Sequence, residues 1–339
     1  MRIVLRAAGW RLVAWACVAA LTCALSIACG LRNARAEDAP NLYQAVVPLQ
    51  SSAEADRSAA FGDALRIVAV RVSGDRNAGS RSDIAEAAAN PARYVQQYAA
   101  RSNRTLSVGF DPQTIEQLVL QAGLPVWPVE RPGTLVLLFT PSVANGQRAL
   151  LAGEGAPGRE QIEKVADQRG IRVTWPLSSI SVGVASDPER LRAPEAAGAA
   201  AKAGVLVGIA EGADFTWRYL DPAGDDATRH GPAAEGAHLV ADTLAAQYAP
   251  PSTRDIRRES IVVGGVPDLG AYAAVISYLE SLSLVRKVDV EEASGSSVRL
   301  GVTLRGDRLL LGRVVATGST LRVAAAQPDT NVTGFVYVP

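Results

Sequence analysis

The segment of residues 106–139 constrains the fold more than any other part of the chain. Apolar residues alternate with others at its start, which predicts a strand with one buried face. Asp111 then predicts a helix N-cap, and Pro112 suits the first helical position, where a missing N–H costs nothing. Gly123 ends the predicted helix. After a loop rich in proline, the continuous apolar run over residues 135–139 predicts a fully buried strand.

The loop between this helix and the second strand carries the most distinctive side chains. Trp127 lies between Pro125 and Pro128, so its backbone has little freedom, and Glu130 and Arg131 follow closely. We expect the whole segment to be the folding centre of the first domain, with Trp127 and Arg131 holding the loop over the edge of the sheet. If the loop has a binding role, we expect Trp127, Glu130 and Arg131 to contact a partner or ligand rather than to carry out chemistry.

A chain of 339 residues is too long for one ordinary core, so several domains are expected. The predicted fold class is α/β (α+β), with two mixed α/β modules followed by a C-terminal ferredoxin-like module of βαββαβ order. The predicted parts are a signal peptide at residues 1–36, an N-terminal α/β domain at 40–140 and a middle α/β domain at 141–250. A ferredoxin-like domain at 258–325 and a tail at 326–339 follow.

The patterns behind these modules are short and are separated by glycine and proline. In the first two modules, helices are predicted at residues 53–72, 159–170 and 237–248. Strands are predicted at residues 42–49, 171–175, 204–210 and 215–220, and the last two of these form a pair. In the last module, Asp268 and Asp307 are predicted helix N-caps, and Gly295 marks a hairpin turn. The tail is expected to be loose, or to add an edge strand at residues 335–338.

The first 36 residues predict a secretory signal peptide. Basic residues precede an apolar run, and a small-x-small site ends at Ala36. Two alternatives stay open: an uncleaved anchor, because the apolar run approaches the roughly 20 residues that span a bilayer, and a lipoprotein signal ending at Cys29. Each alternative exports the bulk of the chain, so we expect a periplasmic protein whose only membrane contact is an uncleaved leader.

Composition narrows the function classes. The chain has 34 basic residues, five of them in the first 36, so 29 remain against 34 acidic residues. Because no basic stripe is interleaved with aromatic residues, we expect no nucleic-acid binding. All three cysteines lie in the leader, which leaves neither a disulfide nor a thiol nucleophile beyond it. His230 and His238 lie in glycine-, alanine- and aspartate-rich sequence, and we expect no metal site and no cofactor.

Three segments in this order and spacing resemble a family of bacterial proteins. They are residues 60–76 (AFGDALRIVAVRVSGDR), 92–98 (ARYVQQY) and 110–132 (FDPQTIEQLVLQAGLPVWPVERP). They resemble domain-of-unknown-function family 2066 (DUF2066), whose members are exported proteins with no assigned activity. The resemblance covers most of residues 40–250. It implies an exported compartment and an α/β fold, and it implies no catalytic residue.

Three functional hypotheses follow. The first is a non-enzymatic scaffold or accessory binding protein of the cell envelope, acting with unknown envelope proteins. The second is an exported hydrolase with a carboxylate or serine site, which would need Asp75, Asp111 or Glu130 to meet a histidine in a cleft. The third is a small-molecule binding module with a groove lined by tryptophans, namely Trp127, Trp175 and Trp217. Asp225 and Asp226 lack the spaced acids of a calcium loop, and we expect a solvated loop there.

Overall fold

The computed structural model describes residues 41–102, 104–141, 150–151, 155–176, 203–223, 225–249, 256–324 and 333–339. The chain divides into two compact units, Met1–Asn41 and Leu42–Pro339, and the elements described below all lie in the second. The described residues form a mixed α/β structure with seven α-helices and three sheets. None of these helices combines the length and the apolar character needed to cross a membrane. The predicted signal peptide lies outside the described residues.

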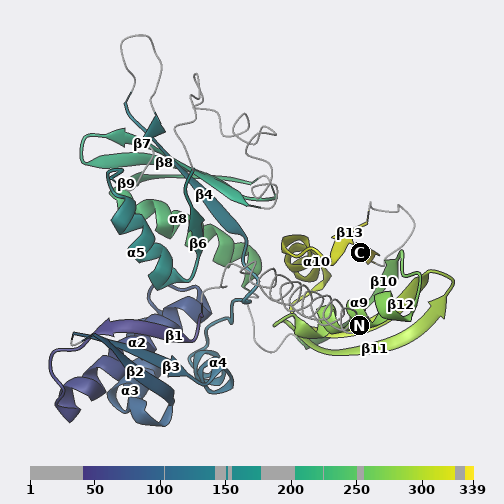
Figure 1. Ribbon diagram of the computed structural model, residues 1–339, viewed down its shortest axis with the longest axis horizontal. Coiled ribbons are helices and arrows are strands. Elements are labelled where there is room, and N and C mark those ends of the chain that lie inside the picture. Colours follow the sequence, from purple (N-terminus) through teal and green to yellow (C-terminus); the bar gives the residue numbers. More distant parts are fainter. Residues whose placement is uncertain are drawn as a thin grey trace, which may run out of the picture. The chain divides into compact units, whose positions relative to one another are not determined.

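The first module has a three-stranded antiparallel sheet in the order β1-β3-β2, with three helices (Figure 1). Its elements are β1 (Gln44–Pro48), α2 (Glu54–Ser73), α3 (Ser82–Ala89), β2 (Val95–Ser102), β3 (Thr105–Phe110) and α4 (Pro112–Gln121). The core lies between the sheet and these helices, where Val68, Val108 and Ile115 are almost completely buried. Helix α2 ends at Gly74, whose φ of 74° places it in the left-handed region that favours glycine.

The start of the segment 106–139 folds as its sequence predicts. The Asp111 carboxylate accepts a hydrogen bond from the Thr114 backbone N–H at 2.8 Å and so caps α4. Pro112 occupies the first helical position, and Gly123 follows the helix with a φ of 72°. The predicted strand, N-cap and glycine stop are therefore confirmed.

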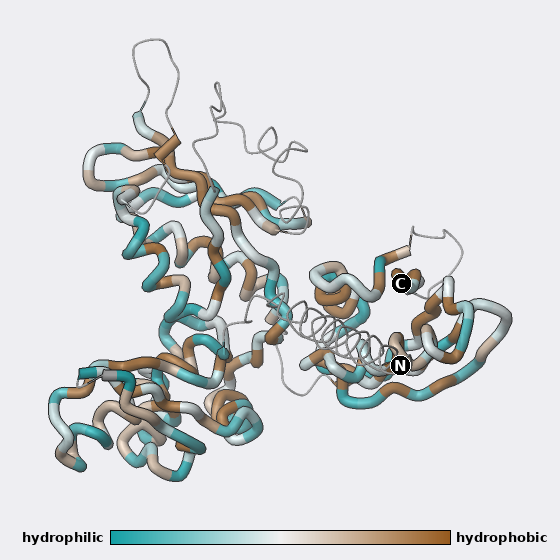
Figure 2. The backbone as a smooth tube through the Cα atoms, in the orientation of Figure 1, coloured by the Kyte–Doolittle hydropathy of each residue, from teal (hydrophilic) through white to brown (hydrophobic). Residues whose placement is uncertain are grey.

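The second module has a six-stranded mixed sheet, with hydrophobic residues along its central strands (Figure 2). Its strands and helices are β4 (Gly133–Phe139), β5 (Leu150–Leu151), α5 (Arg159–Arg169), β6 (Arg172–Thr174), β7 (Gly204–Glu211), β8 (Asp214–Leu220), β9 (Asp226–Gly231) and α8 (Ala233–Tyr248). The order is β5-β4-β7-β8-β9, and β6 also pairs with β4. Strand β4 runs parallel to β6 and β7, and the other pairings are antiparallel.

The place of β4 differs from the expectation that residues 106–139 form one folding centre. Strand β3 belongs to the first sheet, whereas β4 pairs with β7 in the second. The physical reason is that β4 is apolar on both faces: Val136 and Leu138 lie in the core with α5 and α8, and Leu137 and Phe139 lie in a separate apolar cluster. Such a strand is stable only inside a larger sheet. The loop with Trp127 therefore links two modules.

The third module has a five-stranded mixed sheet in the order β11-β12-β10-β14-β13. Its elements are β10 (Ile256–Gly264), α9 (Leu269–Ser281), β11 (Val285–Ser294), β12 (Ser297–Arg305), α10 (Arg308–Thr317), β13 (Leu321–Val323) and β14 (Thr333–Tyr337). Asp268 and Asp307 accept hydrogen bonds from Ala271 and Leu310 N–H at 2.8 and 2.9 Å, so both predicted N-caps are confirmed. Gly295 lies in the β11–β12 turn with a φ of 58°.

The C-terminal strand corrects the expectation of a loose tail or an edge strand. Strand β14 lies inside the sheet, parallel to β10 and antiparallel to β13. Phe335, in its middle, is 1% exposed and packs in the core, which explains why this strand takes an interior position. The elements β10 to β13 keep the predicted βαββαβ order along the chain, but β14 separates the strands that would otherwise be neighbours.

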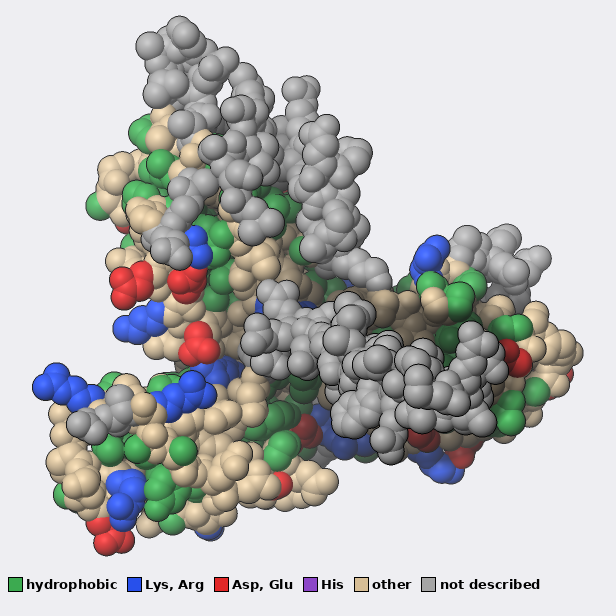
Figure 3. All heavy atoms as spheres, in the orientation of Figure 1, with side chains coloured by type: hydrophobic (Ala, Val, Ile, Leu, Met, Phe, Trp, Pro, Cys, Tyr) green, Lys and Arg blue, Asp and Glu red, His purple; other side chains and the backbone are tan. Residues whose placement is uncertain are grey.

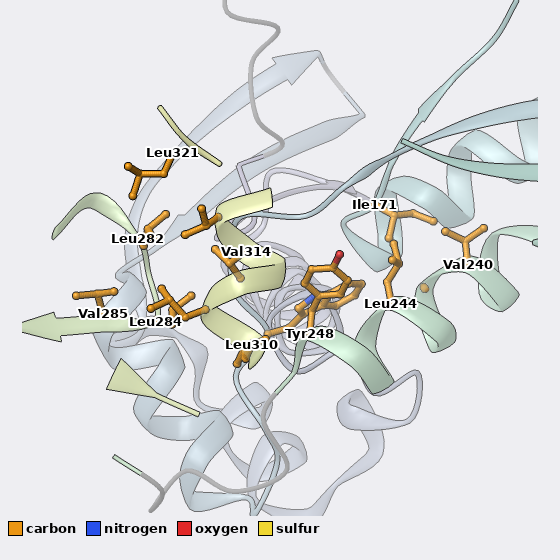
Figure 4. Packing of buried hydrophobic residues seen from close by; sticks show 14 of the residues in the cluster. Ile171, Val240, Leu244, Tyr248, Leu282, Leu284, Val285, Leu310, Val314 and Leu321 are labelled. Carbon is orange, nitrogen blue, oxygen red and sulfur yellow. The ribbon is translucent and has the colours of Figure 1, made fainter. Parts of the chain in front are cut away.

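One continuous apolar cluster joins the second and third modules. It runs from Ile171, Val240 and Leu244 through Tyr248 to Leu310 and Val314 of helix α10 (Figure 4). Tyr248 is the last residue of α8 and is buried. The sequence predicts two separate domains here, at residues 141–250 and 258–325. The described residues of these modules share a core instead.

A candidate binding cleft beside the 126–132 loop

The loop that joins the first two modules is fixed by Trp127. Its backbone N–H donates to the Val72 carbonyl at 2.7 Å, and its side chain is 1% exposed. A Cβ added at Gly74 would lie 2.9 Å from the indole, so only glycine lets the end of α2 come this close. The Arg131 guanidinium stacks on the Trp127 ring, with its carbon 3.7 Å from the ring centroid.

Arg131 is buried among backbone carbonyl groups. Its guanidinium donates to the carbonyls of Arg71 at 2.7 Å, Gly170 at 2.9 Å and Pro128 at 3.0 Å, with longer bonds to Arg169 and Trp127. The first two carbonyls belong to the C-terminal ends of α2 and α5, where the helix macrodipole is negative. Burial lowers the pKa of Arg131 to about 9, so the side chain is still protonated at neutral pH.

Two further arginines complete this junction. Arg71 donates to the backbone carbonyl and the carboxylate of Asp167, both at 2.7 Å. Arg169 donates to the Gly74 carbonyl at 2.9 Å and to Asp242 at 2.7 Å. The bonds of Arg71 to Asp167 and of Arg169 to Gly74 run between the end of α2 and α5, so they join the first module to the second, while the bond to Asp242 ties α5 to α8.

Glu130 connects the same loop to the third module. Its carboxylate accepts hydrogen bonds from the Ser283 hydroxyl at 2.7 Å and the Ser283 N–H at 3.1 Å. The Ser283 hydroxyl also lies 3.2 Å from the Val129 N–H. Residues 127–131 therefore contact all three modules.

A cleft opens beside this loop. It contains about 270 Å³ of empty space, counting space open to solvent. Its walls come from the first module, the loop and the third module, and the residues are Tyr43, Glu116, Val126, Trp127, Pro128, Val129, Ser283, Leu284 and Arg305.

The polar wall of the cleft is organised around Glu116. Tyr43 donates its hydroxyl hydrogen to one carboxylate oxygen at 3.0 Å. Arg305 and Arg286 approach the other oxygen at 3.4 and 3.6 Å. Burial and the neighbouring Glu116 carboxylate raise the pKa of Tyr43 well above its usual value, so the hydroxyl remains a donor. The apolar wall includes the Trp127 indole, whose buried Nε1 has no hydrogen-bond partner among the described residues.

The three residues singled out from the sequence have different places. Trp127 lines the cleft, whereas Arg131 and Glu130 hold the loop that forms it. Their contact with a partner or ligand stays a prediction. Sequence reasoning missed Tyr43, Glu116 and Arg305, which form the polar wall. These positions are far apart along the chain and share no motif, so no sequence signal points to them.

The titratable residues of the hydrolase hypothesis lie elsewhere. Neither histidine lines the cleft: His238 contacts Arg169, with the two nitrogens 2.9 Å apart, and His230 lies 3.6 Å from Glu211. Asp111 caps α4. Within the described ranges no group of three or more histidine, cysteine, aspartate or glutamate side chains could hold a metal ion.

The acidic pair at the start of β9 has local partners. Asp225 accepts a hydrogen bond from Gln247, and Asp226 pairs with Arg218 at 2.6 Å. Both carboxylates thus contact side chains of the same module, without the arrangement of a calcium loop.

Comparison with known proteins gives one match. A family model described as a domain of unknown function (DUF8605) matches residues 36–128. The resemblance to DUF2066 proposed from the sequence is therefore wrong: that family gives no match, and a different family covers two of the segments that suggested it and most of the third. The match covers the first module and reaches Trp127 of the loop. No curated protein matches the chain, and no solved structure matches it.

Proposed function

We propose that this chain is a non-enzymatic accessory protein of the bacterial cell envelope, which binds a partner at the cleft beside Trp127. The observation that carries the proposal is the origin of the cleft walls. Tyr43 and Glu116 come from the first module, Trp127 from the loop, and Leu284 and Arg305 from the third. An occupant would contact all of these parts, so its binding would be coupled to the way the modules are held together.

The chemistry of the walls supports recognition rather than catalysis. Tyr43 is a hydrogen-bond donor with a raised pKa, and Glu116 is held by that hydroxyl and by two guanidinium groups. A general base needs a lone pair that is available to a substrate proton. The Glu116 carboxylate instead already accepts a hydrogen bond from Tyr43 and pairs with two guanidinium groups. Such groups would position a ligand by hydrogen bonds and charge. The hydrolase alternative requires a histidine in the cleft, and neither His230 nor His238 lines it.

The surface in view supports a protein or peptide partner over a nucleic acid. Acidic and basic side chains are interspersed over the described part of the face drawn in Figure 3. A binding surface for a phosphate backbone needs cations gathered along one face. Export through the signal peptide at residues 1–36, and hence a periplasmic site of action, is part of the same proposal.

The third module fits a ferredoxin-like fold with one added strand. Without β14, the order β11-β12-β10-β13 is that of a split βαβ sandwich, and α9 and α10 lie in the corresponding positions along the chain. We propose this assignment as the finer description of the module. It supports a docking role by analogy of architecture alone.

Site-specific photo-crosslinking in intact cells tests the proposed function. A photoreactive residue would replace Val129, which lines the cleft and is 37% exposed. The matched control replaces Val323, which is 45% exposed on β13 and does not line the cleft. We expect one discrete adduct with an envelope protein from position 129 and none from position 323. The adduct from position 129 should disappear when the Arg286→Gln substitution is added. Adducts of equal yield at both positions, or none at either, would contradict the proposal.

A further inference from the structure

We propose that the free edge of strand β2 binds an extended segment of a partner protein as an added strand, and that this segment carries an acidic residue near Arg101. The surface belongs to the first module alone, so the inference goes beyond the proposed function and does not depend on the cleft. It follows from the exposure of β2, from the lack of charge along its centre and from the arginines around it.

Strand β2 is exposed far more than an ordinary strand. It lies at the edge of the first sheet and, among the described elements, pairs only with β3. Residues 96–101 are all exposed. Because successive side chains of a strand point to opposite faces of the sheet, an exposed run of this length leaves both faces of β2 uncovered. The core of the first module therefore uses little of this strand, and an added strand would cover it.

The centre of β2 lacks the usual protection of an edge strand. An unpaired edge presents N–H and C=O groups to other chains, and proteins commonly block it with charged side chains, proline or bulges. Residues 95–100 contain neither a charged residue nor a proline. Register shifts lie on either side of residues 97–100, which pair regularly with β3. This regular stretch is free to accept a partner strand through main-chain hydrogen bonds.

The other edges of the three sheets differ from β2. The long edge strand β11 has charged side chains at five of its ten residues, and β9 carries both an aspartate and an arginine. Strand β1 ends at Pro48, and its Gln44 carbonyl accepts a hydrogen bond from Arg71. Strands β5, β6 and β13 have only two or three residues each. Among the described edges, β2 is therefore the one that offers a long uncharged strand.

The charge around β2 selects the occupant. Residues 87–110 contain three arginines, Arg93, Arg101 and Arg104, and no acidic residue. Arg93 stacks on Tyr94, and within the described residues neither Arg93 nor Arg101 pairs with a carboxylate. A second copy of the chain paired along β2 would bring two such sets of arginines together, which is unfavourable. A partner segment with an acidic residue is complementary instead.

Tyr98 adds a preference for an apolar side chain. It pairs with Val108, which lies in the core of the first module, and its ring lies 5.1 Å from the ring of the buried Phe61. Tyr98 itself is 54% exposed. A partner side chain beside it would extend the core, whereas the opposite face of the sheet offers Gln97 and Ala99. We therefore expect a segment in which apolar and neutral polar residues alternate before an acidic residue.

Fluorescence anisotropy with the full chain and a labelled Glu-Thr-Val-Thr-Val-Glu peptide tests the inference. Acidic residues at both ends allow either strand direction. We expect saturable binding, and about fivefold weaker binding when both glutamates are replaced by lysine. Two further peptides carry N-methyl groups on both valines or on both threonines. At least one of them should bind about tenfold more weakly, because it loses two backbone hydrogen bonds.

Two variants and one localising measurement make the test specific. Arg101→Glu should reverse the preference, so that the peptide with lysine ends binds more tightly than the peptide with glutamate ends. Arg322→Glu is the matched control, since Arg322 is an exposed arginine on the edge strand β13 and should leave the preference unchanged. In hydrogen exchange, the bound peptide should protect amides of residues 96–101 and leave those of β11 unchanged.

Three results would overturn the inference. The first is equal affinity for the N-methylated and unmodified peptides, which would exclude main-chain pairing. The second is an unchanged preference in folded Arg101→Glu, which would exclude the acidic partner. The third is protection of residues 96–101 that rises with protein concentration in the absence of peptide, which would make a second copy of the chain the occupant.

Discussion

Arg131 is a buried cation whose hydrogen bonds, within the part of the chain that the structure describes, all go to backbone carbonyl oxygens. Replacement by lysine keeps the charge, but a single ammonium cannot reach carbonyls on Pro128, Arg71 and Gly170 together. We expect Arg131→Lys to lower the free energy of unfolding by about 3 kcal/mol, because several buried carbonyls lose a partner. Urea denaturation followed by circular dichroism measures this loss. Arg322→Lys, at an exposed position, is the control, and an equal small effect for both would refute the role of Arg131.

His238 makes stability depend on pH. Burial, together with the nearby Arg76 and Arg169 guanidinium groups, lowers the pKa of His238, although Glu235 and Asp242 oppose the shift. The ring must be neutral at Nδ1 to accept from Arg169. Since the unfolded chain binds this proton more readily than the folded one, stability is full above a pH of about 6.5 and falls as the pH drops through and below that value.

We therefore expect His238→Gln to flatten the pH dependence, because glutamine offers an acceptor that does not titrate. Unfolding free energies of both proteins at pH 8, 6.5 and 5.5 provide the measurement. The difference between the two proteins should shift in favour of the variant as the pH falls. Parallel pH profiles would show that another group is responsible.

Sequence reasoning at this scale found residues whose backbone is restrained and missed those placed by tertiary structure. Trp127 and Arg131 stood out because prolines surround them, and they do stack on each other. Arg71 and Arg169 gave no comparable signal, because each lies in an ordinary helical pattern and its partners lie in another module. Local restraint of the backbone can be predicted from the sequence. A hydrogen bond to a carbonyl group in a distant part of the chain cannot.

At the scale of elements, the packing of α8 on the second sheet depends on two glycines around Trp217. A Cβ added at Gly236 would lie 2.7 Å from the indole, and one added at Gly208 would also clash with it. Alanine is the better helix former by about 0.8–1 kcal/mol. Because the clash outweighs this gain, we expect Gly236→Ala to destabilise the protein by about 1–3 kcal/mol.

Gly312 in helix α10 is the matched control. A Cβ at this position would meet nothing within 4 Å. The same substitution, Gly312→Ala, should therefore stabilise the protein by about 0.5–1 kcal/mol. Thermal unfolding of both variants measures whether each substitution lowers or raises the stability. A stabilising Gly236→Ala would show that the helix and sheet can separate without cost.

Elements with a strong local pattern were predicted well, and their partners were not. The caps at Asp111, Asp268 and Asp307 are encoded within three residues, and all three are observed. Strand β4 could not be assigned to its sheet from the sequence. Its apolar pattern indicates that both of its faces are buried, but it does not indicate which strands it pairs with. Strand β14 has the same difficulty, since a short alternating pattern fits an edge or an interior position equally well.

At the scale of the whole unit 42–339, the question is whether the modules unfold separately. The division expected from the sequence suggests independent cores. The cluster through Tyr248, Leu310 and Val314 instead joins the second module to the third, and Arg313 donates to the Gln247 carbonyl at 2.9 Å near the end of α8. Shared burial on this scale favours one cooperative transition.

We expect native-state hydrogen exchange to show the same opening free energy for β7 and β12, which lie in different modules. Tyr248→Ala should lower the global stability by about 3–5 kcal/mol and separate the two values, because Tyr248 joins the two halves of the cluster. Tyr98→Ala, at a tyrosine 54% exposed in the first module, is the control and should leave the two values together. Different opening free energies in the unaltered protein would mean that the shared cluster does not couple the second and third modules.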